Sequence, residues 1–299
     1  MQKQTKDAKM KEKSTISELI ELYKIPTHTI SSTMKKTIKK MIPDYNWTKD
    51  ARGNLYGSHP ESTSNVVLSA HLDMVKTGKD LEYVINSNGI LFGVDKNFEP
   101  TSLGADDKNG LWCIIQASKH PSRPHIVLFE DEEIGRQGSQ DCNIDWFKDK
   151  DCCIVIDRKG ENEIIVEGMR GGYTSLLGPI FKMVNPEWKF EKGLSCDADS
   201  IKCEIDVINI SCGYYNAHTK DEYTVLSELE GTLQAVWNFL DNDWSGLPWD
   251  AIKEFHRHKF GEYKAFVPQN YRNNVSPQAC TEDDEDLTFD EWSRMQGAI

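Results

Sequence analysis

The sequence predicts an α/β protein in which a mostly parallel central sheet is sandwiched between helices. Short apolar runs of strand length alternate along the chain with segments whose apolar residues recur at helical spacing. That alternation is typical of parallel sheets covered on both faces. Acidic residues and histidines directly follow several apolar runs, and ligand sites form at the carboxyl ends of such strands.

The elements follow in order from the N-terminus. Apolar spacing predicts helices at 14–24, behind a serine cap, and at 31–42. The stretch from Gly53 to Gly57 predicts a turn between short strands. Beyond it, strands are expected at 66–71, 82–86, 125–130, 152–157, 163–167 and 206–211, and helices at 107–119, 143–149 and 225–240.

The chain divides into one domain and a tail. With 299 residues, 38% of them hydrophobic, it is long enough for a substantial core. We expect a single domain over 1–242, with 1–13 flexible. For 243–299 we expect a peripheral helix near 249–258 and an acidic extension. Such a charge run is usually solvated, and binding of a partner protein is the alternative.

Charge and composition exclude several classes of protein. The chain has 35 basic and 48 acidic residues, and its net charge of −13 disfavours nucleic acid and anionic membranes as partners. No stretch reaches the roughly 18 consecutive apolar residues of a membrane span. Residues 1–13 lack the apolar core of a signal peptide. The expectation is a cytoplasmic protein.

The 8 cysteines are scattered and form no Cys-x-x-Cys pair. Cys113, Cys152, Cys153 and Cys212 are predicted to be small core residues, which fits a reducing compartment. A zinc site built from thiolates is therefore not expected.

Histidine and acidic side chains recur in a pattern that suits metal binding. The apolar run 66–70 ends in His71, a candidate metal ligand, and Asp73 could accept the second imidazole N–H and fix its tautomer. Further candidate ligands stand at or near the ends of later elements, namely Asp106, Glu133, Asp157 and His218. Neutral imidazoles with carboxylates form a nitrogen and oxygen set that suits Zn²⁺ and also Co²⁺ or Mn²⁺.

Glu132 and Glu133 are adjacent, so on an extended segment their side chains would point to opposite sides. One could then bind metal while the other acts as a general base beside an activated water. Each motif alone also has an ordinary interpretation. Asp106 and Asp107 could cap a helix, and the two glutamates could be a solvated face. Asp157 could be a turn residue at the end of a strand, and His218 a surface histidine. Their ordered recurrence at strand ends favours a hydrolytic metal site.

The same motifs carry a resemblance. The order His71-x-Asp73, then Gly-Ala-Asp-Asp-Lys-x-Gly at 104–110, Asp-Glu-Glu-Ile-Gly at 131–135, Asp157, and Asn-x-His-Thr-x-x-Glu at 216–222 resembles the zinc exopeptidase superfamily. That group includes peptidase T, carboxypeptidase G-type enzymes and co-catalytic aminopeptidases. The resemblance covers roughly 14–240. It implies a zinc-exopeptidase-like α/β/α sandwich of the phosphorylase/hydrolase-like kind.

The resemblance also implies roles for individual residues. Asp106, which stands four residues before Gly110, would bridge two divalent metal ions, which the resemblance implies to be Zn²⁺. His71 and Asp157 would complete one ion, and Glu133 and His218 the other. Glu132 would be the general base, and Asp73 would support the site, as would Glu222.

Two intervals depart from familiar members of the superfamily. His71 and Asp106 are 35 positions apart, and Asp157 and His218 are 61 apart, which leaves no room for an inserted lid or dimerisation domain. The sequence therefore predicts a minimal form with an open site, which suits an aminopeptidase. Arg170 is a candidate for holding a substrate carboxylate, and Asp197 or Asp199 for lining the site.

The function expected from these features is that of a metal-dependent aminopeptidase or small-peptide hydrolase. An N-acyl amino acid amidohydrolase with the same site is the nearest alternative, and a non-catalytic relative that binds metal or peptide is another. The oligomeric state stays open.

Overall fold

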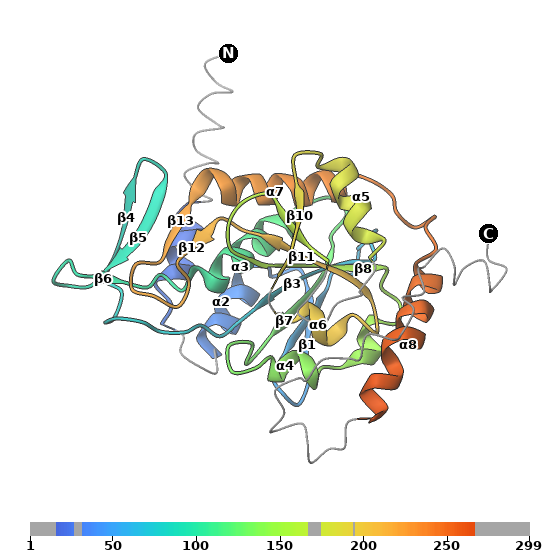
Figure 1. Ribbon diagram of the computed structural model, residues 1–299. Helices are drawn as coiled ribbons and strands as arrows, with labels where there is room; N and C mark the ends of the chain where they lie inside the picture. Colours follow the sequence, from blue (N-terminus) through green and yellow to red (C-terminus); the bar gives the residue numbers. More distant parts are fainter. Residues whose placement is uncertain (1–15, 27–31, 167–174, 194, 267–299) are drawn as a thin grey trace.

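The framework of the protein is an eight-stranded sheet in the order β1-β2-β7-β3-β8-β11-β9-β10 (Figure 1). The structure is a computed structural model that describes residues 16–26, 32–166, 175–193 and 195–266. The four central strands β7, β3, β8 and β11 are parallel, which confirms the predicted fold class. The strands are β1 (Asn46–Lys49), β2 (Leu55–Ser58), β3 (Val66–His71), β7 (His125–Phe129), β8 (Cys152–Arg158), β9 (Glu163–Ile165), β10 (Lys189–Glu191) and β11 (Asp206–Ser211).

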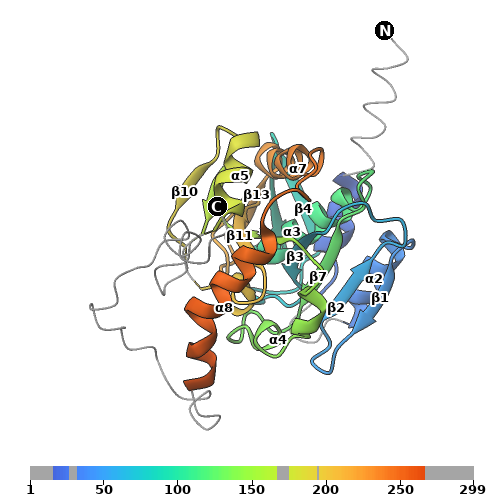
Figure 2. The same ribbon diagram turned by 90° about the vertical axis from the view of Figure 1, so that its right-hand side faces the viewer.

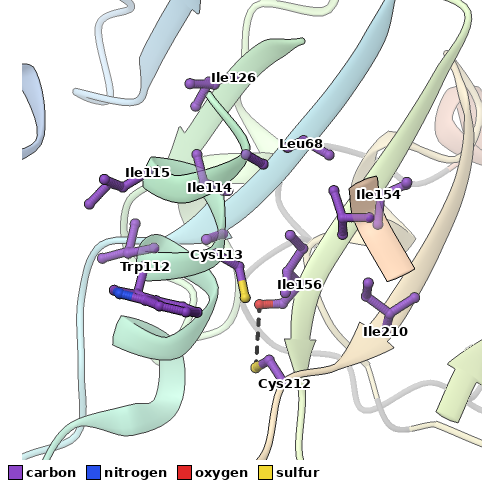
Figure 3. Close-up of a cluster of buried hydrophobic side chains, with 14 of the residues drawn as sticks. Leu68, Trp112, Cys113, Ile114, Ile115, Ile126, Ile154, Ile156, Ile210 and Cys212 are labelled. Atoms are coloured by element: carbon purple, nitrogen blue, oxygen red, sulfur yellow. Dashed lines mark hydrogen bonds between the residues drawn. The ribbon is translucent and has the colours of Figure 1, made fainter. Parts of the chain in front are cut away.

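Helices cover both faces of this sheet (Figures 1 and 2). Alternate strand residues enter two apolar clusters, with Leu68 in the larger and Val67 in the smaller. Figure 3 shows the larger cluster, where side chains of α3 such as Cys113 pack on strand residues such as Ile154. The helices are α2 (Ser32–Met41), α3 (Ala105–Ala117), α4 (Gln137–Gln140), α5 (Leu177–Val184), α6 (Ala198–Ile201), α7 (Leu226–Leu240) and α8 (Trp249–Phe266), with η1 (Ile144–Phe147).

Gly110 allows α3 to lie close to β8. A Cβ at this position would stand 2.1 Å from the backbone oxygen of Ile156 and 2.5 Å from Asp107 Oδ1. Any larger side chain would therefore push the helix away from the strand. The glycine that ends the Gly-Ala-Asp-Asp-Lys-x-Gly motif thus sets the position of α3, whose first turn contains Asp106 and Asp107.

A second sheet of five strands was not foreseen from the sequence. Its order is β12-β13-β5-β4, with β6 paired to β5. The predicted strand at 82–86 belongs here and not to the main sheet, because it forms a hairpin with the segment that follows it. The strands are β4 (Tyr83–Ser87), β5 (Ile90–Val94), β6 (Pro100–Thr101), β12 (Tyr214–Tyr215) and β13 (Tyr223–Val225).

The predicted helix at 143–149 is wrong. Only a single 3₁₀ turn forms there, and Phe147 is its buried residue while Ile144 is 40% exposed. A single buried side chain, that of Phe147, does not stabilise a longer helix. The chain must also change direction before β8 begins at Cys152. The expected helices near 107–119, 225–240 and 249–258 are confirmed as α3, α7 and α8.

Lys108 ties the N-terminal segment to α3. Residues 16–23 are helical, and Leu19, Leu22 and Tyr23 are buried in the larger cluster. The Lys108 ammonium is 4% exposed and donates to the backbone oxygens of Tyr23, Ile25 and Leu103 at 2.9–3.1 Å. The segment that precedes the main sheet is therefore fastened next to the start of α3.

The cysteine prediction is confirmed, since Cys113, Cys152, Cys153 and Cys212 are free and fully buried. Among the described residues, no helix combines the length and the apolar character needed to cross a membrane. The domain boundary at 242 stays a prediction, and the acidic extension lies outside the described residues.

His125 is the first residue of β7 and is 9% exposed. Burial, together with the charge of Lys150, lowers its pKa to about 4. An unfolded histidine takes up a proton near pH 6.5, so stability is lost as the pH falls from about 6.5 towards 4, by roughly 3 kcal/mol. We expect His125→Gln to unfold in urea with a weaker pH dependence than the parent. Parallel curves of unfolding free energy from pH 7 to 4.5 would contradict this.

Candidate metal centre

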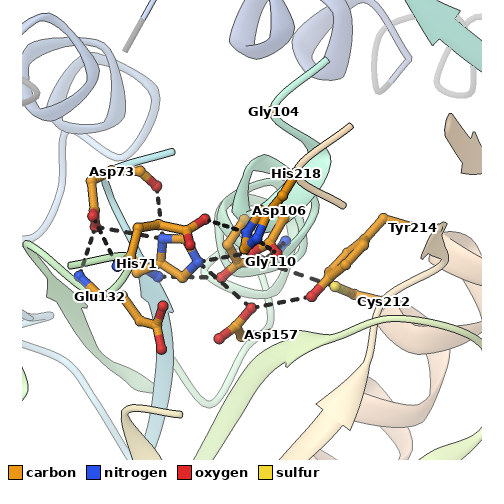
Figure 4. A network of polar contacts seen from close by, with 12 residues as sticks. His71, Asp73, Gly104, Asp106, Gly110, Glu132, Asp157, Cys212, Tyr214 and His218 are labelled. Atoms are coloured by element: carbon orange, nitrogen blue, oxygen red, sulfur yellow. Dashed lines mark hydrogen bonds and ion pairs between the residues drawn. The ribbon is translucent and has the colours of Figure 1, made fainter. Parts of the chain in front are cut away.

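The side chains predicted to bind metal meet at the carboxyl edge of the main sheet (Figure 4). His71 is the last residue of β3, and Asp157 lies near the end of β8. Glu133 follows β7, Asp106 stands in the first turn of α3, and His218 lies in the connection between β12 and β13. Strand ends thus supply part of the cluster, and a helix start and a hairpin supply the rest.

Asp106 lies between the two imidazoles. Its Oδ1 is 2.9 Å from Nε2 of His71, and its Oδ2 is 3.3 Å from Nε2 of His218. On one side, Asp157 Oδ1 is 3.6 Å from Nε2 of His71. On the other, Glu133 Oε1 is 2.9 Å from Nε2 of His218. The five side chains therefore form two groups that share one carboxylate.

Asp107, the next residue, is bound to backbone groups. Its Oδ1 accepts the backbone N–H of Gly110 at 3.0 Å, and its Oδ2 accepts that of His71 at 3.2 Å. The peptide bond between Asp106 and Asp107 is cis. Ligand atoms of His71, Asp107 and Asp157 also lie within 4.8 Å of one another. Because both oxygens of Asp107 already accept backbone N–H groups, one within α3 and one from β3, its geometry favours a structural role.

Asp73 contacts its predicted partner differently from the expectation. Nδ1 of His71 lies 2.7 Å from the backbone oxygen of Asp73, whereas the carboxylate Oδ1 is 3.6 Å away. The carboxylate instead accepts the backbone N–H groups of Glu132 at 3.0 Å and Glu133 at 3.1 Å. Asp73 therefore fixes both the imidazole and the turn that carries the two glutamates.

The prediction that Glu132 and Glu133 lie on an extended segment is wrong. The chain turns directly after β7, and the oxygen of Glu132 accepts the N–H groups of Gly135 and Arg136 at 3.0 Å and 2.8 Å. The turn begins at Asp131, whose φ is 57°. The rule that successive side chains of a strand point to opposite faces therefore does not apply to Glu132 and Glu133.

Two residues that support the cluster come from the β12–β13 hairpin. Glu222 is 2% exposed and accepts the backbone N–H of Gly104 at 2.7 Å and that of Asp106 at 3.3 Å. Its expected position beside the site is thereby confirmed. Tyr214 was not foreseen, and its hydroxyl lies 3.5 Å from Asp157 Oδ1. The sequence signal that could have indicated it is its position two residues before Asn216, which begins the Asn-x-His motif.

The other expected residues do not all reach the cluster. Arg170 lies outside the described residues. Asp197 is 1% exposed, and burial raises its pKa to about 7. Asp199 forms ion pairs with Lys202 at 3.2 Å and Arg136 at 3.8 Å.

Burial and neighbouring charges shift the pKa of several groups in the cluster. Burial raises the pKa of Asp157 well above its usual value, and that of Glu132 to about 8. Burial alone would lower the pKa of His71, but Asp157, Asp106 and Asp73 raise it well above its usual value. Hydrogen bonds to Asp106 and Glu133 raise the pKa of His218 to about 10.

The shifts of the carboxylates thus follow mainly from burial, and those of the imidazoles from the carboxylates beside them. Two imidazoles and three carboxylates form a mixed nitrogen and oxygen donor set, as Zn²⁺, Co²⁺ and Mn²⁺ prefer. Divalent cations would neutralise the charge of these carboxylates. The residues present therefore fit a pair of divalent metal ions.

The sequence matches no protein-family model and no curated protein sequence. Solved structures, however, share the fold. Aminopeptidase PepT from Bacillus cereus aligns with a TM-score of 0.65 at 15% identity, over 76% of this chain and 98% of that one. A tripeptidase from Staphylococcus aureus aligns with a TM-score of 0.66 at 14% identity, over 76% and 97%.

A TET aminopeptidase from a marine-sediment Thaumarchaeota archaeon aligns with a TM-score of 0.59 at 11% identity, over 82% of this chain and 99% of that one. These identities are low, so the likeness concerns the fold. The α/β architecture implied by the resemblance to zinc exopeptidases is thus the architecture of solved peptidase structures.

Glu222→Gln tests how the start of α3 is held. The variant places an amide N–H₂ group against a backbone N–H, so one buried donor loses its acceptor, at a cost of about 1–3 kcal/mol. We expect a lower unfolding free energy in urea and fewer metal equivalents retained after dialysis. Glu228→Gln is the matched control, because Glu228 accepts the Tyr215 hydroxyl at 2.7 Å on the other side of the hairpin. Equal behaviour of the two variants would contradict this role.

Proposed function

We propose that this chain is a metal-dependent exopeptidase, an aminopeptidase or small-peptide hydrolase, with a co-catalytic pair of divalent metal ions. The observation that carries the proposal is the position of Asp106, whose two oxygens lie 2.9 Å and 3.3 Å from the imidazoles of His71 and His218. A carboxylate shared between two ligand groups is what a two-metal site requires. Residues 1–242 would form the catalytic domain.

The distances between the side chains assign the proposed ligands to two metal ions. His71 and Asp157 would hold one ion, Glu133 and His218 the other, and Asp106 both. We favour Zn²⁺, with Co²⁺ or Mn²⁺ as alternatives that the same donors accept. When bound, such ions would polarise the scissile carbonyl and make water more acidic.

Glu132 is the general base of the proposal. Its carboxylate takes a proton from the attacking water and passes it to the nitrogen of the leaving amine. Burial raises the pKa of the Glu132 carboxyl to about 8, so this group holds a proton more readily than an exposed glutamate does. Asp73 holds the backbone of Glu132 and the ring of His71 in place through the contacts described above.

Two features support a peptidase that acts on short peptides. Solved structures with this fold include an aminopeptidase and a tripeptidase. In the described parts of 72–105 and 158–217, the strands join the two sheets and the helices pack on the main one. Among those residues, no inserted lid is found that would hold the far end of a substrate. The proposed site would therefore recognise a peptide mainly by the free amino terminus of the substrate.

A substrate panel separates this proposal from its nearest rival, an N-acyl amino acid amidohydrolase. The full chain is assayed with aminoacyl chromogenic amides, dipeptides, tripeptides and N-acyl amino acids after addition of Zn²⁺, Co²⁺ or Mn²⁺. We expect turnover of substrates with a free amino terminus. Activity confined to acylated substrates would replace the peptidase proposal with the amidohydrolase.

Glu132→Ala removes the proposed base. We expect turnover to fall by at least about 100-fold, because general-base catalysis contributes on this scale, while metal content stays at the parent level. Asp131→Asn is the matched control, since it removes a neighbouring acidic group from the same turn. Unchanged turnover in Glu132→Ala would refute the assigned role, and a metal-bound parent without turnover on any substrate would indicate a non-catalytic relative.

A further inference from the structure

We infer that Tyr214 is a positioning residue that sets the orientation of the Asp157 carboxylate, so that the β12–β13 hairpin acts on both proposed metal positions. This inference rests on the metal centre proposed above. It concerns a side chain that contains no proposed ligand atom and acts through its hydroxyl group.

The tyrosine ring is buried, and its hydroxyl reaches the cluster. Tyr214 is 5% exposed and packs in the larger apolar cluster. Its hydroxyl lies 3.5 Å from Asp157 Oδ1, the oxygen that is 3.6 Å from Nε2 of His71 (Figure 4). A hydroxyl donor normally approaches to 2.5–3.0 Å, so the present contact is a long one that would shorten if the carboxylate turned towards the phenol.

The backbone that carries Tyr214 is fixed to the end of β8. The N–H of Cys212 donates to the oxygen of Arg158 at 2.8 Å, and that of Gly213 donates to Gly160 at 3.0 Å. The oxygen of Tyr214 accepts the N–H of Gly160 at 3.0 Å. These three hydrogen bonds join residues 212–214 to Arg158 and Gly160, which follow Asp157 in the chain. The phenol and the carboxylate are therefore held on one rigid unit, as a supporting hydrogen bond requires.

The same hairpin also holds the other side of the cluster. Its connecting loop carries His218, which contacts Asp106 and Glu133. The residue before β13 is Glu222, which accepts the backbone N–H of Asp106. A single hairpin thus contacts the proposed shared ligand and, through Tyr214, the proposed ligand of the first ion. Binding of the two ions is then linked through one structural element.

The neighbouring tyrosine provides a matched control. Tyr215 points to the opposite face of the strand, where its hydroxyl donates to Glu228 at 2.7 Å and its ring stacks on Tyr223 at 5.0 Å between centroids. Tyr214→Phe and Tyr215→Phe each delete one hydroxyl beside one carboxylate and keep the ring. Only the first lies beside a proposed metal ligand.

The experiment uses the full chain, stripped of metal with a chelator and titrated with Zn²⁺ by calorimetry and with Co²⁺ by visible absorption. We expect Tyr214→Phe to keep the parent's unfolding midpoint in urea, to bind one ion about 10-fold more weakly, and to show an altered Co²⁺ spectrum. Tyr215→Phe should match the parent in all three measurements. In an Asp157→Asn background, Tyr214→Phe should have no further effect, because the two changes act on one interaction.

Three results would overturn the inference. Parent-like metal binding and spectrum in Tyr214→Phe would remove it while leaving the metal centre intact, and so would an undiminished effect of Tyr214→Phe in the Asp157→Asn background. A parent chain that binds no metal would overturn the proposed centre and this inference together.

Discussion

The repulsion among buried carboxylates is the constraint on which the site depends. Asp106, Asp107 and Asp157 stand close together at the edge of the sheet, and the pKa of Asp107 and Asp157 is raised well above the usual value by burial. Backbone N–H groups relieve part of this charge, as when Asp107 accepts from His71 and Gly110. The imidazoles relieve another part. The proposed divalent cations would offset the charge that remains.

Parallel strand pairing explains why part of the site could be predicted from the sequence. Strands β7, β3 and β8 are neighbours, so the residues at their carboxyl ends meet without any further folding. His71 and Asp157 were therefore identifiable as the last residues of apolar runs, and Glu133 as one that follows such a run. A short local pattern contains that information, because a strand's length and its end are both local properties.

The remaining parts depend on long-range pairing that a local pattern does not contain. Strands β12 and β13 have two and three residues, too few for a periodic signal. They pair with each other, and β13 also pairs with β5, more than a hundred positions earlier. The contacts of the Asp73 carboxylate were not foreseen for a similar reason. The turn after β7 brings the backbone N–H groups of Glu132 and Glu133 within hydrogen-bonding distance of this carboxylate.

The two proposed metal positions differ in how they are built, and this difference follows from the topology. His71 and Asp157 come from adjacent parallel strands, and their side chains are 1% and 8% exposed. His218 comes from a hairpin loop and its side chain is 48% exposed, so water competes with its contacts to Asp106 and Glu133. The first position is therefore preorganised by the main sheet, whereas the second depends on how firmly the hairpin is held. Glu222 and Tyr214 join that hairpin to α3 and β8, which makes the small sheet a structural part of the centre.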